Sequence, residues 1–149
     1  MCFIIVTGAI IAFLDQICKY FVRSYIPENS FYDTFIPFLK IGHIENQGAA
    51  FGSFLGMRLC LVLFSVVALF IMIYFIFKKG INNKKYSIAI SCVIGGAVSN
   101  LFDRIVYGSV TDYLKLTFFD PVCNLGDYCI CLGAFAFIIL ILKNEKIHK

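Results

Sequence analysis

The chain has 149 residues, enough for one domain, and 60% of them are hydrophobic, with a mean hydropathy of +0.88. A soluble domain has about 45–50% apolar residues and could not bury this much apolar surface, so lipid must be the solvent for much of the chain. The net charge is +4, and basic residues gather in two stretches beside apolar runs, 78–85 and the tail after Leu142. This placement is typical of membrane topology signals. It argues against a nucleic-acid partner, which needs a basic face with polar or aromatic support.

The seven cysteines and two histidines include no CxxC pair. Most of the cysteines lie in or beside apolar runs, where cysteine behaves as a small hydrophobe. A zinc site needs several Cys or His ligands at short spacing. The sequence therefore predicts no metal site, and nothing in it indicates a cofactor.

Four apolar stretches follow one another along the chain, at about 3–22, 59–77, 86–102 and 128–142. A helix of about 20 residues spans the hydrocarbon layer, and only a helix satisfies its own backbone there. The last two stretches are shorter, so we expect their polar ends, around Asp103 and Asp127, near the membrane interface. The sequence thus predicts a mainly α membrane protein, a single domain over 1–149 with four transmembrane helices.

The first stretch contains Asp15 and Lys19, lacks a basic start and is followed by no A-x-A-like site, so we expect it to be retained. Four crossings place both termini and both lysine-rich stretches on one side, which the positive-inside rule makes the cytoplasm. The segments 23–57 and 103–127 then face outward.

The outward segment 23–57 is rich in aromatic and β-branched residues, and its pattern from about Phe38 to Ile44 is strand-like. We expect a small β element there, lying on the membrane surface.

Charged residues inside a membrane span cost about 2.5–3.5 kcal/mol on insertion scales, so Asp15 and Lys19 are informative. They stand four residues apart on one helix face, where they can form a structural ion pair or the polar wall of an active site. In the third stretch, Ser91, Gly95 and Ser99 form a small-residue stripe that allows close helix packing. Asn100, Asp103 and Arg104 follow it and serve either as interfacial caps or as a buried polar network.

Two further acids lie near the outer ends of the spans. Asp112 alone reads as a solvated loop acid. Asn124 fits a helix N-cap, with Asp127 in the first turn, where an acid is favoured by the helix dipole. The small residues of the segment 45–52 (ENQGAAFG) suit either a plain turn or a close backbone approach to a substrate.

Two carboxylates close together cannot both ionise easily, so such a pair can act as general acid and general base on a water molecule. Spacing alone does not decide which of the four candidates pair; they are Asp15, Asp103, Asp112 and Asp127. Two other classes remain open at this point. One is a small transporter or channel subunit with Asp15, Lys19 and Asp103 as an ion relay. The other is a structural membrane adaptor.

These motifs resemble those of the lipoprotein signal peptidases (signal peptidase II), membrane aspartic endopeptidases of bacteria. The resemblance covers nearly the whole chain in five ordered motifs. In chain order they are Asp15, Gln16 and Lys19; Asn46, Gly48, Ala50, Phe51 and Gly52; Gly95, Gly96, Asn100, Asp103 and Arg104; Val110 and Asp112; Asn124 and Asp127.

The resemblance implies that Asp112 and Asp127 are the catalytic dyad. It implies that the following residues support the dyad or bind substrate: Asp15, Lys19, Asn46, Gly48, Asn100, Arg104 and Asn124. It also implies a β-cradle formed by the first outward segment, in the bacterial plasma membrane with the active site facing outward. The implied partners are prolipoproteins carrying a diacylglyceryl cysteine, cut just before that cysteine, membrane lipids, and the cyclic-peptide or macrocyclic inhibitors of the family.

The chain departs from the family pattern at four positions. Ser99, Tyr113, Cys123 and Gly126 stand where the family usually has glycine, phenylalanine, an aromatic residue and alanine. None of these changes removes a reacting group. Gly126 is expected to loosen the first turn of the last span, since glycine costs about 0.5–1 kcal/mol relative to alanine in a helix.

Overall fold

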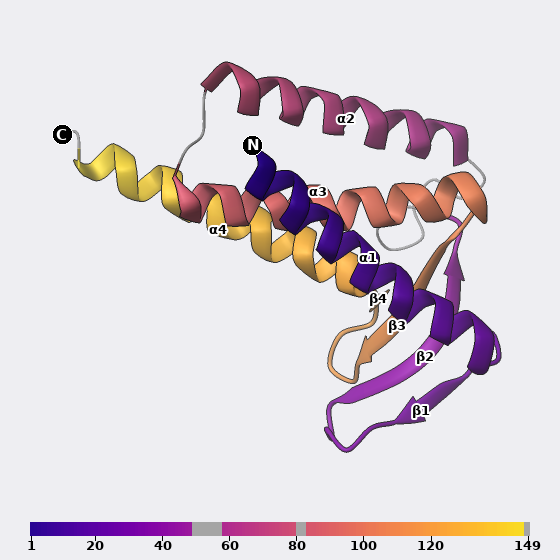
Figure 1. Ribbon diagram of the computed structural model, residues 1–149. Helices are drawn as coiled ribbons and strands as arrows, with labels where there is room; N and C mark the ends of the chain where they lie inside the picture. Colours follow the sequence, from indigo (N-terminus) through magenta and orange to yellow (C-terminus); the bar gives the residue numbers. More distant parts are fainter. Residues whose placement is uncertain (49–57, 80–82, 148–149) are drawn as a thin grey trace.

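The computed structural model describes residues 1–48, 58–79 and 83–147 and is mainly helical (Figure 1). The four helices are α1 (Cys2–Tyr25), α2 (Arg58–Lys79), α3 (Lys84–Val106) and α4 (Leu125–Ile147). Helix α3 packs against α1 on one side and α4 on another, and α2 lies along it with fewer contacts. The start of α1 and the end of α4 lie at one end of the bundle, and the strands lie at the other.

Membrane-spanning character is clear for three of the described helices. Cys2–Tyr25, Lys84–Val106 and Leu125–Lys143 are long and apolar enough to cross a bilayer. The expected span 59–77 falls within α2, whose apolar segment Leu59–Tyr74 is shorter. A fourth crossing therefore stays a prediction.

The distribution of side chains is the reverse of that in a soluble protein. Large apolar side chains such as Phe13, Phe64 and Phe135 are 66%, 74% and 64% exposed. The largest fully buried side chains are polar: Lys19, Asn124, Thr111, Asp15, Asp103, Ser91 and Ser99. Apolar groups on the outside match a lipid solvent, and the polar interior marks the part of the bundle where a site can be built.

The close packing of α3 depends on two adjacent glycines that face different partners. A Cβ atom on Gly95 would lie 2.6 Å from the Gly8 backbone oxygen of α1, and one on Gly96 would collide with the Gly126 backbone oxygen of α4. Ser91 Oγ also donates to the Ile4 backbone oxygen at 3.4 Å. The prediction that the stripe of small residues allows a close helix approach is confirmed.

A four-stranded antiparallel sheet caps the bundle, in the order β1 (Phe31–Asp33), β2 (Leu39–Asn46), β3 (Val110–Leu116) and β4 (Val122–Cys123). The strand-like pattern from Phe38 onward is confirmed by β2. Strands β3 and β4 were not predicted, because Asp112 and the short length of β4 obscure an alternating pattern. The sheet therefore joins the two segments expected to face outward, and its pairing of Ile44 with Asp112 brings one candidate acid beside β2.

The motif residues Ala50, Phe51 and Gly52 lie outside the described residues. Of that motif, the structure describes Asn46, at the end of β2, and Gly48.

The glycine contact between α3 and α4 makes a direct prediction. Gly96→Ala forces a methyl group against the Gly126 backbone oxygen, and overpacking of this kind costs about 1–3 kcal/mol. We expect a lower midpoint of thermal unfolding for the protein purified in detergent. Gly8→Ala is the matched control, because its Cβ would meet its nearest neighbour at an ordinary 3.5 Å. Equal midpoints for the two variants would contradict the packing described for α3 and α4.

Candidate active site

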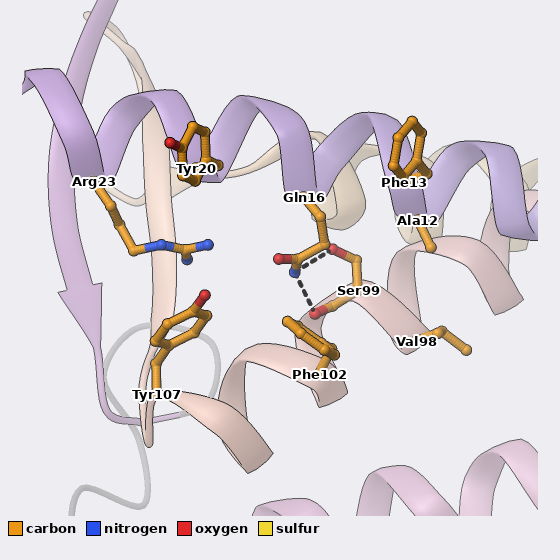
Figure 2. A pocket seen from close by; sticks show the side chains of 9 residues that line it. All are labelled: Ala12, Phe13, Gln16, Tyr20, Arg23, Val98, Ser99, Phe102 and Tyr107. Atoms are coloured by element: carbon orange, nitrogen blue, oxygen red, sulfur yellow. Dashed lines mark hydrogen bonds between the residues drawn. The ribbon is translucent and has the colours of Figure 1, made fainter.

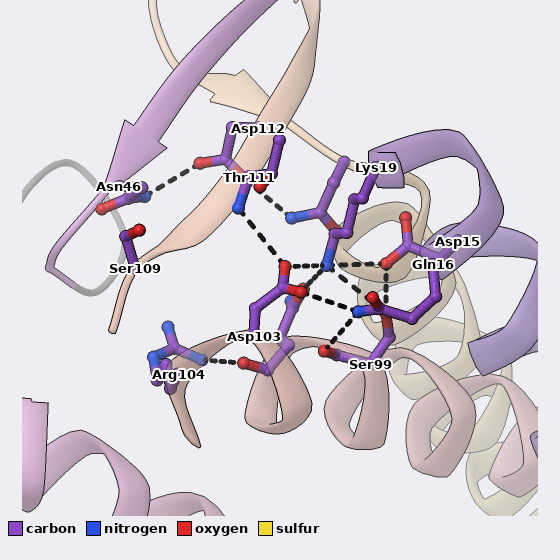
Figure 3. Close-up of polar contacts among 12 residues, drawn as sticks. Asp15, Gln16, Lys19, Asn46, Ser99, Asp103, Arg104, Ser109, Thr111 and Asp112 are labelled. Atoms are coloured by element: carbon purple, nitrogen blue, oxygen red, sulfur yellow. Dashed lines mark hydrogen bonds and ion pairs between the residues drawn. The ribbon is translucent and has the colours of Figure 1, made fainter. Parts of the chain in front are cut away.

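The Lys19 ammonium on α1 is a fully buried charge, because the Lys19 side chain has no exposed surface. It forms ion pairs with Asp15 Oδ2 at 2.8 Å and with Asp103 Oδ2 at 2.9 Å (Figure 3). It also donates to Asn100 Oδ1 at 2.7 Å and to Ser99 Oγ at 3.3 Å. A buried cation is tolerated when it is paired and its donors are satisfied, and both conditions are met here.

Asp127 lies in the first turn of α4 and is connected to Lys19 through one side chain. Asn100 accepts from Lys19 with its oxygen and donates its Nδ2 to Asp127 Oδ1 at 2.8 Å. The other oxygen, Asp127 Oδ2, accepts from the Asn124 backbone N–H at 3.1 Å. In return, Asn124 Oδ1 accepts from the Asp127 backbone N–H at 2.8 Å. The expected N-cap at Asn124 is confirmed, and the reciprocal bonds form a capping box.

Asp112 lies on β3 and is held from both sides by amides. Asn124 Nδ2 donates to Asp112 Oδ1 at 2.7 Å, and Asn46 Nδ2 donates to Asp112 Oδ2 at 2.9 Å. Asn124 therefore contacts both Asp112 and Asp127, through its side-chain amide and its backbone. Its side chain is wholly buried, so it holds the two acids in a fixed relation.

The electrostatic environment of Asp112 favours a protonated carboxyl. Burial and then the negative charge of Asp127 raise the pKa of Asp112 from 3.8 to about 7. The hydrogen bonds from Asn46 and Asn124 and the charge of Lys19 oppose this rise without cancelling it. An acid with a pKa near 7 keeps a large protonated fraction at neutral pH and can donate a proton there.

Arg104 and Gly48 lie near Asp112, to which they are connected through Asn46. Arg104 Nη1 donates to the Asn100 backbone oxygen and Nη2 to the Gly48 backbone oxygen, each at 3.4 Å. The Gly48 N–H donates to Asn46 Oδ1 at 3.0 Å. Arg104 thus links α3 to the segment just after β2, next to the asparagine that contacts Asp112.

Asp15 and Lys19 form the ion pair that their spacing allows, and they also support the site, because Lys19 reaches Asp127 through Asn100. The interpretation as a structural ion pair is confirmed, and the interpretation as the polar wall of an active site stays a prediction. Asp103 belongs to the same cluster, where it pairs with Lys19 and accepts from Gln16 Nε2 at 2.8 Å. Within the described part of the chain, it forms no hydrogen bond with Asp112 or Asp127.

Sequence reasoning missed a second polar chain that continues from Asp103 to the sheet. Arg23 contacts Asp103 at 3.5 Å and donates to Thr111 Oγ1 at 2.7 Å, and Thr111 donates to Glu45 Oε1 at 2.8 Å. Burial raises the pKa of Glu45, but hydrogen bonds from Ser109, His43 and Thr111 outweigh it and lower the pKa below its ordinary value. The spacing of Arg23, four residues after Lys19, was a usable signal. Glu45 meets Thr111 only through the register of β2 on β3.

Cys123 on β4 is near the two acids but is no candidate nucleophile. Burial, with the charges of Asp127 and Asp112, raises its pKa to about 11. The thiol is therefore protonated at neutral pH, and only the thiolate is a strong nucleophile. Among the described residues, no group of three or more His, Cys, Asp or Glu side chains could hold a metal ion.

A groove of about 420 Å³ lies between α1 and α3 (Figure 2), and its lining residues do not include Asp112 or Asp127. Its walls are mainly apolar, and Gln16 and Arg23 point into it from α1, with Ser99 across from them on α3. Gln16 Nε2 is already bound to Ser99 and Asp103, and Arg23 stacks over Tyr107 at 4.1 Å. The groove therefore borders the Lys19 cluster at Gln16 and Ser99.

A bundle of apolar helices with a buried polar cluster and two amide-bound aspartates fits a membrane protein of the aspartic peptidase type. The family model for signal peptidase (SPase) II matches residues 7–143. The chain belongs to this family and is an aspartic-type signal peptidase II.

Curated relatives support the assignment. The lipoprotein signal peptidase of Caldanaerobacter subterraneus subsp. tengcongensis is 35% identical over 130 residues, which are 87% of this chain and 89% of that protein. The lipoprotein signal peptidase of Clostridium tetani is 33% identical over 146 residues, which are 95% of this chain and 92% of that protein.

The fold has solved counterparts. One structure of a bacterial membrane enzyme, determined by the in meso method at 2.3 Å, superposes with a TM-score of 0.91 at 27% identity and covers 98% of this chain and 91% of that one. A second, at 1.9 Å, gives a TM-score of 0.86 at 26% identity, with 94% and 92% covered.

The raised pKa of Asp112 predicts a specific dependence of stability on pH. Between pH values of about 4 and 7 the unfolded chain releases the Asp112 proton while the folded protein keeps it, so the free energy of unfolding falls as pH rises. The Asp112→Asn variant has no carboxyl at this position, so its free energy of unfolding does not fall for this reason. Its unfolding midpoint relative to the unchanged protein is therefore expected to rise between about pH 5 and pH 8.

Thermal unfolding in detergent at the two pH values measures this difference. Asp33→Asn is the control, because the Asp33 side chain is 82% exposed and forms a surface ion pair with Lys40. A midpoint difference for Asp112→Asn that is the same at both pH values would show that Asp112 titrates alike in the folded and unfolded chains.

Proposed function

We propose that Asp112 and Asp127 are the catalytic dyad with which this peptidase removes signal peptides from prolipoproteins. The substrate is a prolipoprotein whose cysteine already carries a diacylglyceryl group, and the bond cut is the one just before that cysteine. The observation that carries the proposal is the placement of the two carboxyl groups. Asn124 contacts both, and each carboxyl also accepts from a second asparagine, Asn46 or Asn100.

The dyad holds one shared proton at neutral pH, in keeping with the raised pKa of Asp112. The proton belongs to the pair, because interacting acids titrate together. The unprotonated carboxylate removes a proton from water as its oxygen attacks the scissile carbonyl carbon, and the protonated carboxyl gives its proton to the carbonyl oxygen. A tetrahedral diol results.

The diol then collapses by the reverse set of transfers. The carboxyl that took the water proton passes it to the leaving nitrogen, and the other carboxylate takes a hydroxyl proton from the diol. The C–N bond breaks, which leaves the signal peptide with a new carboxyl end and the lipid-modified cysteine with a free amine. The dyad returns to its singly protonated state, so the cycle needs no cofactor.

The asparagines and Arg104 position these groups and the substrate backbone. Asn46 and Asn100 each donate to one aspartate, which keeps the carboxyl planes fixed while the proton moves. Arg104 and Gly48 stand at the rim beside Asn46, where a backbone carbonyl of the substrate can be held. Lys19 and Asp15 act behind them by fixing Asn100.

We further propose four membrane crossings, including α2, in the bacterial plasma membrane with both termini in the cytoplasm. The two termini share one end of the bundle, where the lysine-rich stretches also begin or end, at Lys79, Lys84 and Lys143. The sheet and the dyad lie at the other end, which then faces outward. The signal helix of the substrate lies among the spans, with its lipid chains in the bilayer.

Separate Asp112→Asn and Asp127→Asn variants test the dyad. Each keeps the shape of the side chain and removes its acid–base function, so we expect cleavage to fall by about 10²–10⁴-fold. Cleavage of a diacylglyceryl-modified prolipoprotein is followed by gel shift with the variants in lipid vesicles. Asp33→Asn is the matched control and keeps full turnover. Near-normal turnover in either dyad variant would refute the assignment.

A second arm of the same assay uses the prolipoprotein before lipid modification. We expect little or no cleavage of it, because the acyl chains hold the scissile bond at the depth of the dyad. Equal cleavage of both forms would contradict the proposed substrate while leaving the dyad itself in place.

A further inference from the structure

Asp15 is held by donors from three different elements. Its Oδ2 accepts from Ser99 Oγ of α3 at 2.6 Å and pairs with Lys19 of α1 at 2.8 Å. Its Oδ1 accepts from the hydroxyl of Tyr113 on β3 at 3.0 Å. The carboxylate has no exposed surface, and these contacts hold both of its oxygens in place.

The Tyr113 hydroxyl also reaches the start of α4. It accepts from the Leu125 backbone N–H at 3.2 Å. The first N–H groups of a helix have no acceptor within the helix, so this bond satisfies one of them. Burial raises the pKa of Tyr113 well above its ordinary value, so the hydroxyl keeps the proton that it donates to Asp15.

The Tyr113 hydroxyl thereby connects the strand that carries Asp112 to the helix that carries Asp127, without contacting either carboxyl group. Tyr113 directly follows Asp112 on β3, and Leu125 stands two residues before Asp127 on α4. Side chains of consecutive strand residues point to opposite faces, so Tyr113 works behind the strand while Asp112 faces Asn46 and Asn124.

Gly126 brings the first turn of α4 directly against the Asp15 carboxylate. A Cβ atom at Gly126 would lie 2.9 Å from Asp15 Oδ2, 3.0 Å from Asn124 Oδ1 and 3.1 Å from the Gly96 backbone oxygen. Asp15 is held as described, Asn124 is bound to Asp112, and Gly96 is backbone of α3. None of these three atoms can move away easily, so the first turn of α4, which carries Asp127, packs directly against Asp15.

We propose that Ser99 and Tyr113 are positioning residues that set the separation of Asp112 and Asp127 by fixing Asp15 against the first turn of α4. The inference rests on the proposed function of the dyad and extends it to two side chains that touch neither reacting carboxyl. A displacement of about 1 Å in such a pair can cost about 100-fold in rate, so small movements of this turn matter.

Tyr113→Phe removes only the hydroxyl. Without it, the start of α4 moves away from β3, and the kcat for the lipid-modified prolipoprotein is expected to fall about 10-fold with KM unchanged. A larger separation weakens the repulsion by which Asp127 raises the pKa of Asp112. The shared proton is then lost at a lower pH, so the alkaline limb of the kcat profile shifts to lower pH.

Tyr86→Phe is the matched control. The Tyr86 hydroxyl also bonds α4, donating to the Leu140 backbone oxygen at 2.9 Å, but far along the helix from the dyad. It is expected to keep the kcat and the pH profile of the unchanged protein. An unaltered kcat and pH profile in Tyr113→Phe, or the same alteration in both variants, would overturn the inference.

A double-mutant cycle of Ser99→Ala and Gly126→Ala tests the part played by Asp15, so the inference does not depend on Tyr113→Phe alone. Gly126→Ala should lower kcat about 10-fold or more, because its methyl group meets a carboxylate that cannot move. Ser99→Ala releases Asp15 Oδ2 from its 2.6 Å donor, so the Ser99→Ala/Gly126→Ala pair should recover several-fold of that loss.

Gly133→Ala supplies the control for helix packing alone. Its Cβ would lie 2.6 Å from the Ala89 backbone oxygen, on the same α3–α4 contact but away from Asp15. If Gly133→Ala lowers kcat, adding Ser99→Ala should not restore it. Independent, multiplicative effects of Ser99→Ala and Gly126→Ala would overturn the inference. Failure of the unchanged protein to cleave the prolipoprotein would instead refute the proposed function, so the two failures are distinguishable.

Discussion

The buried Lys19 ammonium is the constraint on which the rest of the site depends. Removing an ammonium from water costs several kcal/mol unless charged and polar partners compensate. Here Asp15 and Asp103 supply the opposite charge, and Ser99 and Asn100 supply further acceptors. These partners come from α1 and α3, so satisfying one charge fixes the relation of two helices. Asn100 is then turned so that its amide faces Asp127.

The surrounding lipid explains why a polar cluster holds the molecule together. Where the solvent is hydrocarbon, burying apolar side chains gives helices little reason to associate, so close packing and internal polar contacts must do so. In this chain Gly95 and Gly96 allow the close packing, and the Lys19 cluster supplies the polar contacts. The same cluster reaches Asp127 through Asn100, so residues that hold the helices together also contact the proposed dyad.

Sequence reasoning reached the features that depend on neighbours along the chain. The pairing of Asp15 with Lys19 follows from a spacing of four residues, and the cap at Asn124 follows from its place before an apolar run. The pairing of Asp112 with Asp127 rested on family resemblance, because a strand and a helix bring them together only in three dimensions. The contact of Tyr113 was missed for the same reason: its hydroxyl donates to Asp15, 98 residues away.

The shared proton of the dyad is the central claim, and infrared titration tests it most directly. The carbonyl stretch of a protonated carboxyl is separate from that of a carboxylate, so the protein in lipid vesicles can be titrated without substrate. One such band is expected to disappear as pH rises through about 7, and to be absent throughout the titration of Asp112→Asn. The absence of any band that titrates near pH 7, or the persistence of such a band in Asp112→Asn, would contradict a proton held by this pair.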